Sequence, residues 1–118
     1  DLRDIEKAAE QGNQRAELAV EVLVESIRFY IGSYLVALNG ADAICFTGGI
    51  GQFSSNIREK VLENMDFAGI KLDLDKNREI DGKQENRIDQ IDSKVQIWVI
   101  PTNEELIVAR QTLTVLTH

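Results

Sequence analysis

The sequence contains few cysteine, histidine and basic residues, and these shortages limit the classes of protein to which it can belong. A single cysteine, Cys45, rules out a disulfide framework within the chain, which is the usual support of small secreted domains. A single histidine, His118, stands at the last position, where we assign it no role as a general base. Acidic residues outnumber basic ones by 20 to 13, giving a net charge of −7. This balance argues against nucleic acid or an anionic membrane as a partner.

The remaining composition, 43% hydrophobic and 28% charged, is ordinary for a globular protein. A chain of 118 residues is long enough for one domain with a real core. The sequence starts at Asp1 without a methionine, so we expect residues 1–118 to be a single incomplete domain cut from a longer protein. Cys45 lies in an apolar stretch and is expected to be a buried small hydrophobe. A chain without disulfides fits a cytoplasmic location.

Hydrophobic periodicity predicts an α/β fold. The segments 43–47 and 95–100 are short and almost continuously apolar, which is typical of parallel strands covered on both faces. A helix in the connection between them satisfies the right-handed crossover of such strands. The order is therefore helix, strand, helix, strand, helix. The predicted helices are 1–11, 13–38, a helix from Ser54 or Ser55 to about Phe67, and a last helix from Thr102 to about Val115.

Side-chain patterns predict which surfaces are buried. Helix 13–38 is apolar around most of its circumference, so we expect it to be buried on most sides. Residues 69–93 are polar and irregular, with a short edge strand at 87–91 and a charged run, 73–83, that is interpreted as a solvated surface excursion. In the helix that follows Ser54 we expect an inner face of Ile57, Val61, Leu62 and Met65 and an outer face of Arg58, Glu59, Lys60 and Glu63.

A glycine-rich segment follows the first predicted strand. The order is a strand ending at Thr47, a turn containing Gly48, Gly49 and Gly51, and then a helix start. Glycine allows positive φ and the close approach of a ligand, and the first turn of a helix offers free N–H groups to an anion. The spacing is neither GxGxxG nor a P-loop, so a glycine-rich connection without any ligand stays open.

The second predicted strand is also followed by residues that could bind a ligand. Pro101 stops it, and Thr102 with Glu105 forms a capping box for the last helix. In open α/β sheets, ligands bind beyond the carboxyl ends of the strands. Because both strand ends carry candidate groups, their convergence favours a binding site there over a glycine turn without a ligand.

Three segments together resemble one known family. They are Asp1-Leu2-Arg3-Asp4, then Asp42-Ala43-Ile44-Cys45-Phe46-Thr47-Gly48-Gly49-Ile50-Gly51, and Val99-Ile100-Pro101-Thr102-Asn103-Glu104-Glu105-Leu106. The chain closely resembles the carboxy-terminal part of the second domain of acetate kinases. The resemblance implies the actin, Hsp70 and sugar-kinase type of nucleotide-binding fold, which is ribonuclease H-like. It also implies transfer of a phosphoryl group from ATP to acetate, giving ADP and acetyl phosphate. Propionate and butyrate kinases are relatives, so another short-chain carboxylate stays open.

The resemblance also implies site residues. Contacts to the nucleotide fall on Asp1, Leu2 and Arg3, and on the loop of Gly49, Ile50, Gly51, Gln52 and Phe53. The family usually has Glu-Asn where this sequence has Gln52-Phe53, so an amide near the nucleotide is lost and Phe53 can only stack or pack. Glu104 matches the family's magnesium-associated glutamate, and a hard cation such as Mg²⁺ prefers such an oxygen ligand. The alternative is that Glu104 merely complements the helix dipole.

The resemblance implies that the acetate pocket and the charged residues around the transferring phosphoryl group lie upstream. We therefore expect no catalytic residue in these 118 residues and no activity from them alone. The resemblance also implies a homodimer joined through this domain, and open sheet edges invite pairing, so self-association is expected. The alternatives are a non-catalytic nucleotide-binding or dimerisation module from a truncated or degenerate gene, and an α/β domain without a ligand.

Overall fold

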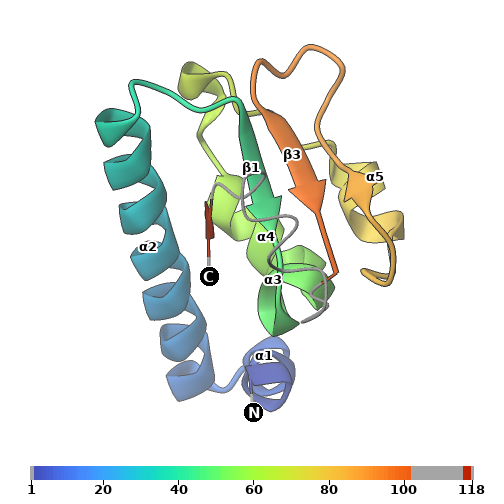
Figure 1. Cartoon of the computed structure of the whole chain (residues 1–118). Helices are drawn as coiled ribbons and strands as arrows, with labels where there is room; N and C mark the ends of the chain where they lie inside the picture. The colour runs from blue at the N-terminus through green and yellow to red at the C-terminus, as the bar shows by residue number, and fades with distance from the viewer. Residues whose placement is uncertain (1, 102–115, 118) are drawn as a thin grey trace.

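The computed structural model describes residues 2–101 and 116–117. They form a small sheet with helices packed around it (Figure 1). In chain order the elements are α1 (Leu2–Glu10), α2 (Gln14–Ala37), β1 (Ala43–Phe46), α3 (Gly49–Phe53), α4 (Ser55–Leu62), the 3₁₀ helix η1 (Asp66–Ala68), α5 (Leu74–Glu79), β2 (Asn86–Arg87), β3 (Gln96–Val99) and β4 (Leu116–Thr117).

The sheet has the strand order β2-β3-β1-β4. The two strands expected to be parallel are parallel neighbours, with Ala43 opposite Gln96 and Phe46 opposite Val99. Strand β4 also pairs with β1 in parallel, whereas β2 pairs with β3 in the antiparallel direction, so the sheet is mixed. The α/β class is confirmed. The predicted last helix and its capping box lie outside the described residues.

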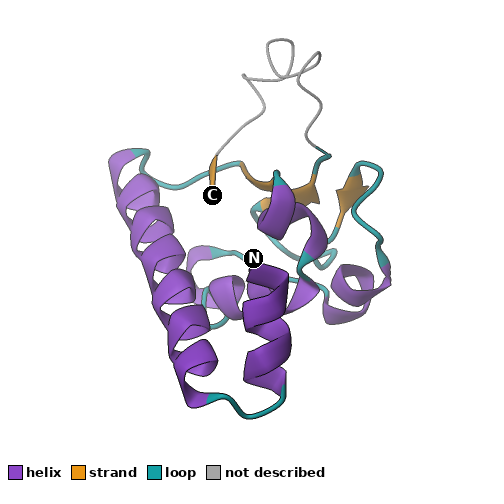
Figure 2. Cartoon of the chain, turned by 90° about the horizontal axis from the view of Figure 1, so that it is seen from below, coloured by secondary structure: helices purple, strands orange, loops and turns teal. Residues whose placement is uncertain are grey.

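One continuous hydrophobic core joins the sheet to α2 and α4. Cys45 is buried in β1, as expected. Figure 2, viewed from below, shows α1 and α2 lying side by side, joined by a short turn. The buried core residues are Val20, Val24, Ile31, Ile44, Phe46, Ile57, Val61, Leu62, Met65, Ile70, Ile88, Val95, Ile97 and Val99.

Helix α2 starts with the expected cap, because Asn13 Oδ1 accepts the backbone N–H of Ala16 at 3.1 Å. The expectation that α2 is buried on most sides is wrong for the described chain. The helix packs against α1, α4 and the sheet along one stripe, and nothing in residues 2–101 and 116–117 covers its other face. Large apolar side chains are exposed there: Leu18, Val22, Phe29, Tyr30, Tyr34, Val36 and Leu38.

Helix α4 differs from its prediction in two ways. It ends at Leu62 rather than near Phe67, because Glu63 leaves the helix with ψ 138° and Asn64 takes a positive φ of 57°. The four residues expected on the inner face are all buried, although Met65 lies beyond the end of α4. Arg58, expected on the outer face, is only 1% exposed.

The charged run 73–83 is not merely a solvated excursion. It contains α5, whose first turn is capped by Asp73 Oδ1 accepting the N–H of Lys76 at 3.0 Å. Asn77 of α5 is completely buried. The expected edge strand is present, but β2 spans only Asn86–Arg87, and an isolated bridge then joins Leu72 to Asp89. Among the described residues, none of the helices is both long and apolar enough to cross a membrane.

Candidate functional site

The glycine segment lies at the carboxyl end of β1, in the centre of the sheet (Figure 1). Gly48 follows the strand with φ 72° and ψ 152°, a backbone conformation that residues other than glycine rarely adopt. Helix α3 begins at once with Gly49 and lasts five residues, so the expected turn is one residue long and most of the segment is helical. Gly51 packs on Phe46, and an added Cβ would meet that side chain at 3.5 Å.

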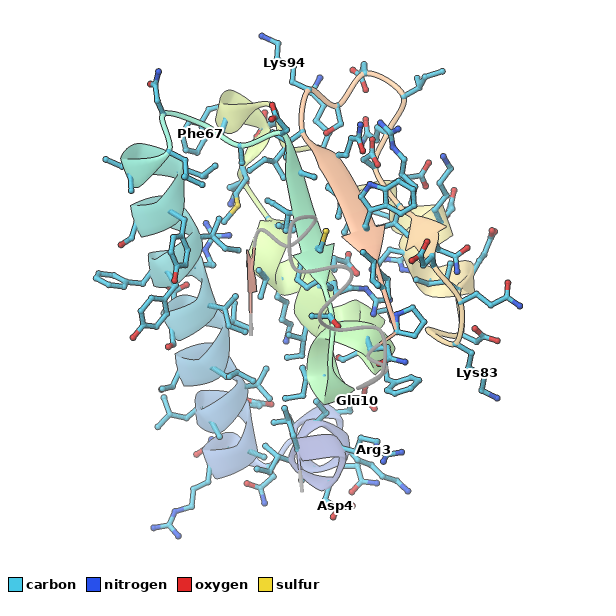
Figure 3. The ribbon with its side chains drawn as sticks, viewed as in Figure 1. Arg3, Asp4, Glu10, Phe67, Lys83 and Lys94 are labelled. Atoms are coloured by element: carbon cyan, nitrogen blue, oxygen red, sulfur yellow. The ribbon has the colours of Figure 1, made fainter. Side chains whose placement is uncertain are left out.

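A first hollow of about 230 Å³ opens where the beginning of α1 meets α3. It brings together residues that are nearly fifty positions apart in the sequence. Figure 3 labels Arg3 on α1, which lies below α3 in this view. The lining residues are Leu2, Arg3, Glu6, Gly49, Ile50, Phe53 and Ser54. Five of the residues predicted to contact a nucleotide therefore line one hollow, and Asp1 lies outside the described residues.

Ser54 fastens α1 to this site. Its hydroxyl oxygen accepts the N–H of Ile57 at 3.1 Å, which caps α4, and its O–H donates to Glu6 Oε1 on α1. One side chain thus fixes the start of α4 and the distance between α1 and the glycine segment. The sequence left the start of this helix open between Ser54 and Ser55, and the structure selects Ser54 as its cap. Nothing in the sequence indicated Glu6, because a contact between residues 48 positions apart leaves no trace in local spacing.

A second hollow of about 270 Å³ lies between the glycine segment and α2. Its walls are mainly apolar. They comprise Leu23, Ile27, Phe46, Thr47, Gly48, Gly49, Ile50, Gly51 and Ile57. Gly49 and Ile50 line both hollows, so the backbone at the start of α3 forms the wall between them.

The side chains of the adjacent residues Gln52 and Phe53 lie in different environments. The side chain of Gln52 is buried, and its Nε2 donates to the carbonyl oxygen of Gly82 at 2.8 Å. Phe53 is 56% exposed and lines the first hollow. The chain takes φ 77° at Gly82, where a Cβ would lie 2.3 Å from the carbonyl oxygen of Gln52. The loop after α5 therefore packs directly against α3.

A buried arginine holds the other end of α3. Arg58 Nη1 donates to the carbonyl oxygens of Gly51 at 3.0 Å and Gln52 at 3.1 Å. Its Nε and Nη2 donate to Oδ1 and the carbonyl oxygen of Asn77 at 2.7 and 3.1 Å. Asn77 Nδ2 in turn donates to the carbonyl oxygen of Ser55 at 2.9 Å. Burial lowers the pKa of Arg58 to about 10, so the side chain is still a cation at neutral pH.

The sequence held one signal for this arginine. Positions 54, 57, 58, 61, 62 and 65 repeat at the three- and four-residue spacing of one helix face, so Arg58 falls within the apolar stripe of α4. Its charge alone led to the prediction of an outer position. The partner Asn77 could not be predicted, because it belongs to a short helix inside a charged run.

Metal ligands do not gather among the described residues. Residues 2–101 and 116–117 contain no group of three or more histidine, cysteine, aspartate or glutamate side chains placed to hold an ion. The predicted magnesium ligand, Glu104, lies outside the described residues, as does the segment around it.

Solved structures with the same fold identify the class. The structure matches the acetate kinase of Porphyromonas gingivalis with a TM-score of 0.85 and 42% identity, covering 96% of this chain and 28% of that one. It matches a propionate kinase from Francisella tularensis with a TM-score of 0.77 and 33% identity, covering 98% of this chain and 29% of that one. The fold is therefore that of the acetate kinases, the predicted actin-like nucleotide-binding type.

The sequence comparisons name the family. The model of the acetokinase family matches residues 1–110, and the chain belongs to this family. It is 53% identical to the acetate kinase of Acetivibrio thermocellus over 113 residues, which is 96% of this chain and 28% of that protein. It is 50% identical to the acetate kinase of Methanosarcina thermophila over 112 residues, which is 95% of this chain and 27% of that protein.

The chain spans little more than a quarter of the length of the curated relatives it matches. These shares say how much of the relatives is matched and not which part, so the carboxy-terminal placement stays a prediction. The same holds for the roles of the individual site residues.

Proposed function

We propose that these residues are the nucleotide-contacting part of an acetate-kinase-type phosphotransferase, which moves a phosphoryl group from ATP to the carboxylate of acetate. The proposal rests on one observation: five of the residues that the family resemblance assigns to the nucleotide come from two distant segments and line a single hollow. Family membership supports the reaction class. ATP and ADP are the proposed ligands of this hollow.

The lining suggests how a nucleotide would be held. Leu2, Ile50 and Phe53 offer apolar surface, and the ring of Phe53 is exposed enough to stack on a base. Gly49 lets a phosphate or ribose approach the backbone closely. Of the described residues that line the two hollows, only Arg3 is basic, so it is the group suited to an anionic part of the ligand.

A divalent cation, proposed to be Mg²⁺, would neutralise phosphate charge in this reaction. Among the described lining residues of the first hollow, Glu6 is the only carboxylate, and it already accepts the O–H of Ser54. The described residues alone therefore do not make a magnesium site. We propose that Glu104 supplies the protein oxygen, with waters and phosphates as the remaining ligands, as Mg²⁺ commonly requires.

Acetate, or another short-chain carboxylate, would be bound by other parts of the protein. Phosphoryl transfer needs several charges placed around the transferring group, whereas Arg3 is the only cation that the described lining provides. We therefore expect these 118 residues alone to produce no acetyl phosphate. Detectable formation of acetyl phosphate by them would contradict this expectation. The location proposed for the protein is the cytoplasm, where ATP is available.

A second candidate is a non-catalytic nucleotide-binding or dimerisation module. Two observations favour it: Gln52 is engaged in the interior at a position where the family usually has Glu, and α2 exposes an apolar face that includes Phe29. A homodimer would bury that face. Light scattering at micromolar concentration tests this part, because a monodisperse monomer would exclude self-association.

Calorimetric titration with ATP, with and without Mg²⁺, tests the nucleotide site. We expect Arg3→Ala to weaken binding about tenfold, since it removes the one cation among the described lining residues. Glu104→Ala is expected to abolish the magnesium dependence. Arg15→Ala is the matched control, because Arg15 is an exposed arginine of α2 outside both hollows. Equal affinities of Arg3→Ala and the unsubstituted protein would exclude the hollow as the nucleotide site.

A further inference from the structure

Helix α3 is too short to hold its own position. Its five residues form barely more than one turn, and a helix of this length is unstable in water without packing. Its first turn nevertheless forms the wall of both hollows. The contacts that fix α3 therefore decide where the glycine backbone lies relative to α1.

Those contacts come from residues that do not line the first hollow. The guanidinium of Arg58 lies at the carboxyl end of α3 and donates to the carbonyls of Gly51 and Gln52. The last carbonyls of a helix lack partners within it, and a cation there also suits the helix dipole. Asn77 anchors the same guanidinium through two acceptors, its carbonyl oxygen and its side-chain oxygen.

We propose that Arg58 and Asn77 act as a positioning pair that fixes the backbone of residues 49–53 for nucleotide binding. The inference rests on the proposed function, and it assigns roles to two residues outside the predicted site. Neither residue lines either hollow, so their effect on a ligand is transmitted through the carbonyls of α3.

The chemistry explains why an arginine is needed. Its planar group carries five donors in a fixed geometry, and here it reaches four acceptors in α3 and α5 at once. A lysine carries the same charge but has three donors on one nitrogen, so it cannot reach both helices in this arrangement. Arg58→Lys therefore separates the role of the hydrogen-bond geometry from that of charge.

A set of four substitutions tests the pair. Arg58→Lys and Asn77→Ala disturb it. Asp89→Asn is the matched control for lost stability, because it weakens a buried polar contact between β2 and β3 that touches neither α3 nor α5. Lys60→Met is the surface control on α4. Amide hydrogen exchange without nucleotide is measured for each folded protein, followed by titration with ATP.

In Arg58→Lys and Asn77→Ala we expect exchange at the amides of residues 49–54 to rise by more than the general increase that lost stability brings to the core amides. We also expect affinity for ATP about tenfold lower. Asp89→Asn should lose stability with neither effect. Wild-type exchange at residues 49–54 in both variants would overturn the inference, and so would unchanged affinity. If the unsubstituted protein binds no ATP, the proposed function fails, while the exchange measurement still decides whether the pair positions the segment.

Discussion

The side chains of Arg58 and Asn77, 19 residues apart in sequence, hold each other inside the protein, with Nε 2.7 Å from Oδ1. This contact joins α4 to α5 and, through the other guanidinium donors, joins both to the end of α3. A charged group and an amide thus occupy positions that an apolar pair could fill. Because a buried cation costs free energy unless its donors are satisfied, each partner makes the other necessary.

Asn77→Ala is expected to lower the free energy of unfolding by about 3 kcal/mol, because it removes the acceptor of the buried Arg58 Nε and the donor to the carbonyl oxygen of Ser55. Gln84→Ala serves as the control, since Gln84 is exposed and its side chain takes part in no described hydrogen bond. Urea denaturation measures both variants. A loss for Asn77→Ala no larger than that of the control would show that Arg58 finds other partners.

Ser54→Ala is expected to cost about 1 kcal/mol, the usual value of a lost amino-terminal cap. It also removes the bond from Ser54 to Glu6, so α1 should exchange its amides faster. Ser55→Ala is the matched control, because the neighbouring serine makes its described bond through its backbone carbonyl. Thermal denaturation and hydrogen exchange compare the two variants. Equal effects from both would contradict the role given to Ser54.

Gly82→Ala should be more damaging than Gly12→Ala. Both glycines have positive φ, 77° and 88°, so both substitutions strain the backbone by about 1–2 kcal/mol. A Cβ at Gly12 meets nothing within 4 Å, whereas one at Gly82 collides with the carbonyl oxygen of Gln52. Denaturant titration should therefore show a total loss of about 3 kcal/mol or more for Gly82→Ala. Equal losses would show that the loop moves away from α3 at little cost.

Asp89 gives stability that depends on pH. Burial tends to raise the pKa of its carboxyl, but hydrogen bonds from Arg87 and the N–H of Ile97 outweigh burial and hold it below the ordinary value. The stabilisation is therefore complete above about pH 4 and is lost as the pH falls through the lowered pKa. Asp89→Asn should cost about 1–2 kcal/mol at pH 7. Urea denaturation should show this difference shrinking towards pH 2, and a constant difference would contradict the assignment.

Much of the fold followed from hydrophobic pattern. Local sequence predicts the two central strands, their parallel pairing, the long helix and a serine cap at Ser54 or Ser55, since apolar runs and capping residues act over a few positions. Helix α5 was missed because a six-residue helix with one apolar residue at its start carries almost no periodic signal. The exposed face of α2 was missed because periodicity shows which faces are apolar and not what is present to cover them.

The candidate site was predicted in part. The meeting of Arg3 with the glycine segment follows from the family resemblance, and the described geometry brings these residues to one hollow. The inward turn of Gln52 depends on Gly82, which is 30 residues away, and sequence spacing does not report a contact of that kind. Arg58 was placed outside because charge was given more weight than its position on the helix stripe.

The most direct test of the nucleotide site is hydrogen exchange of the protein with and without ATP and Mg²⁺. We predict slower exchange in the segments 2–6 and 49–54, which carry the lining residues of the first hollow, and unchanged exchange in α5 and β2. The same protection should be absent when Arg3 is replaced by alanine at subsaturating ATP. Protection elsewhere in the chain, or no protection at saturating nucleotide, would contradict the assignment of this hollow to ATP.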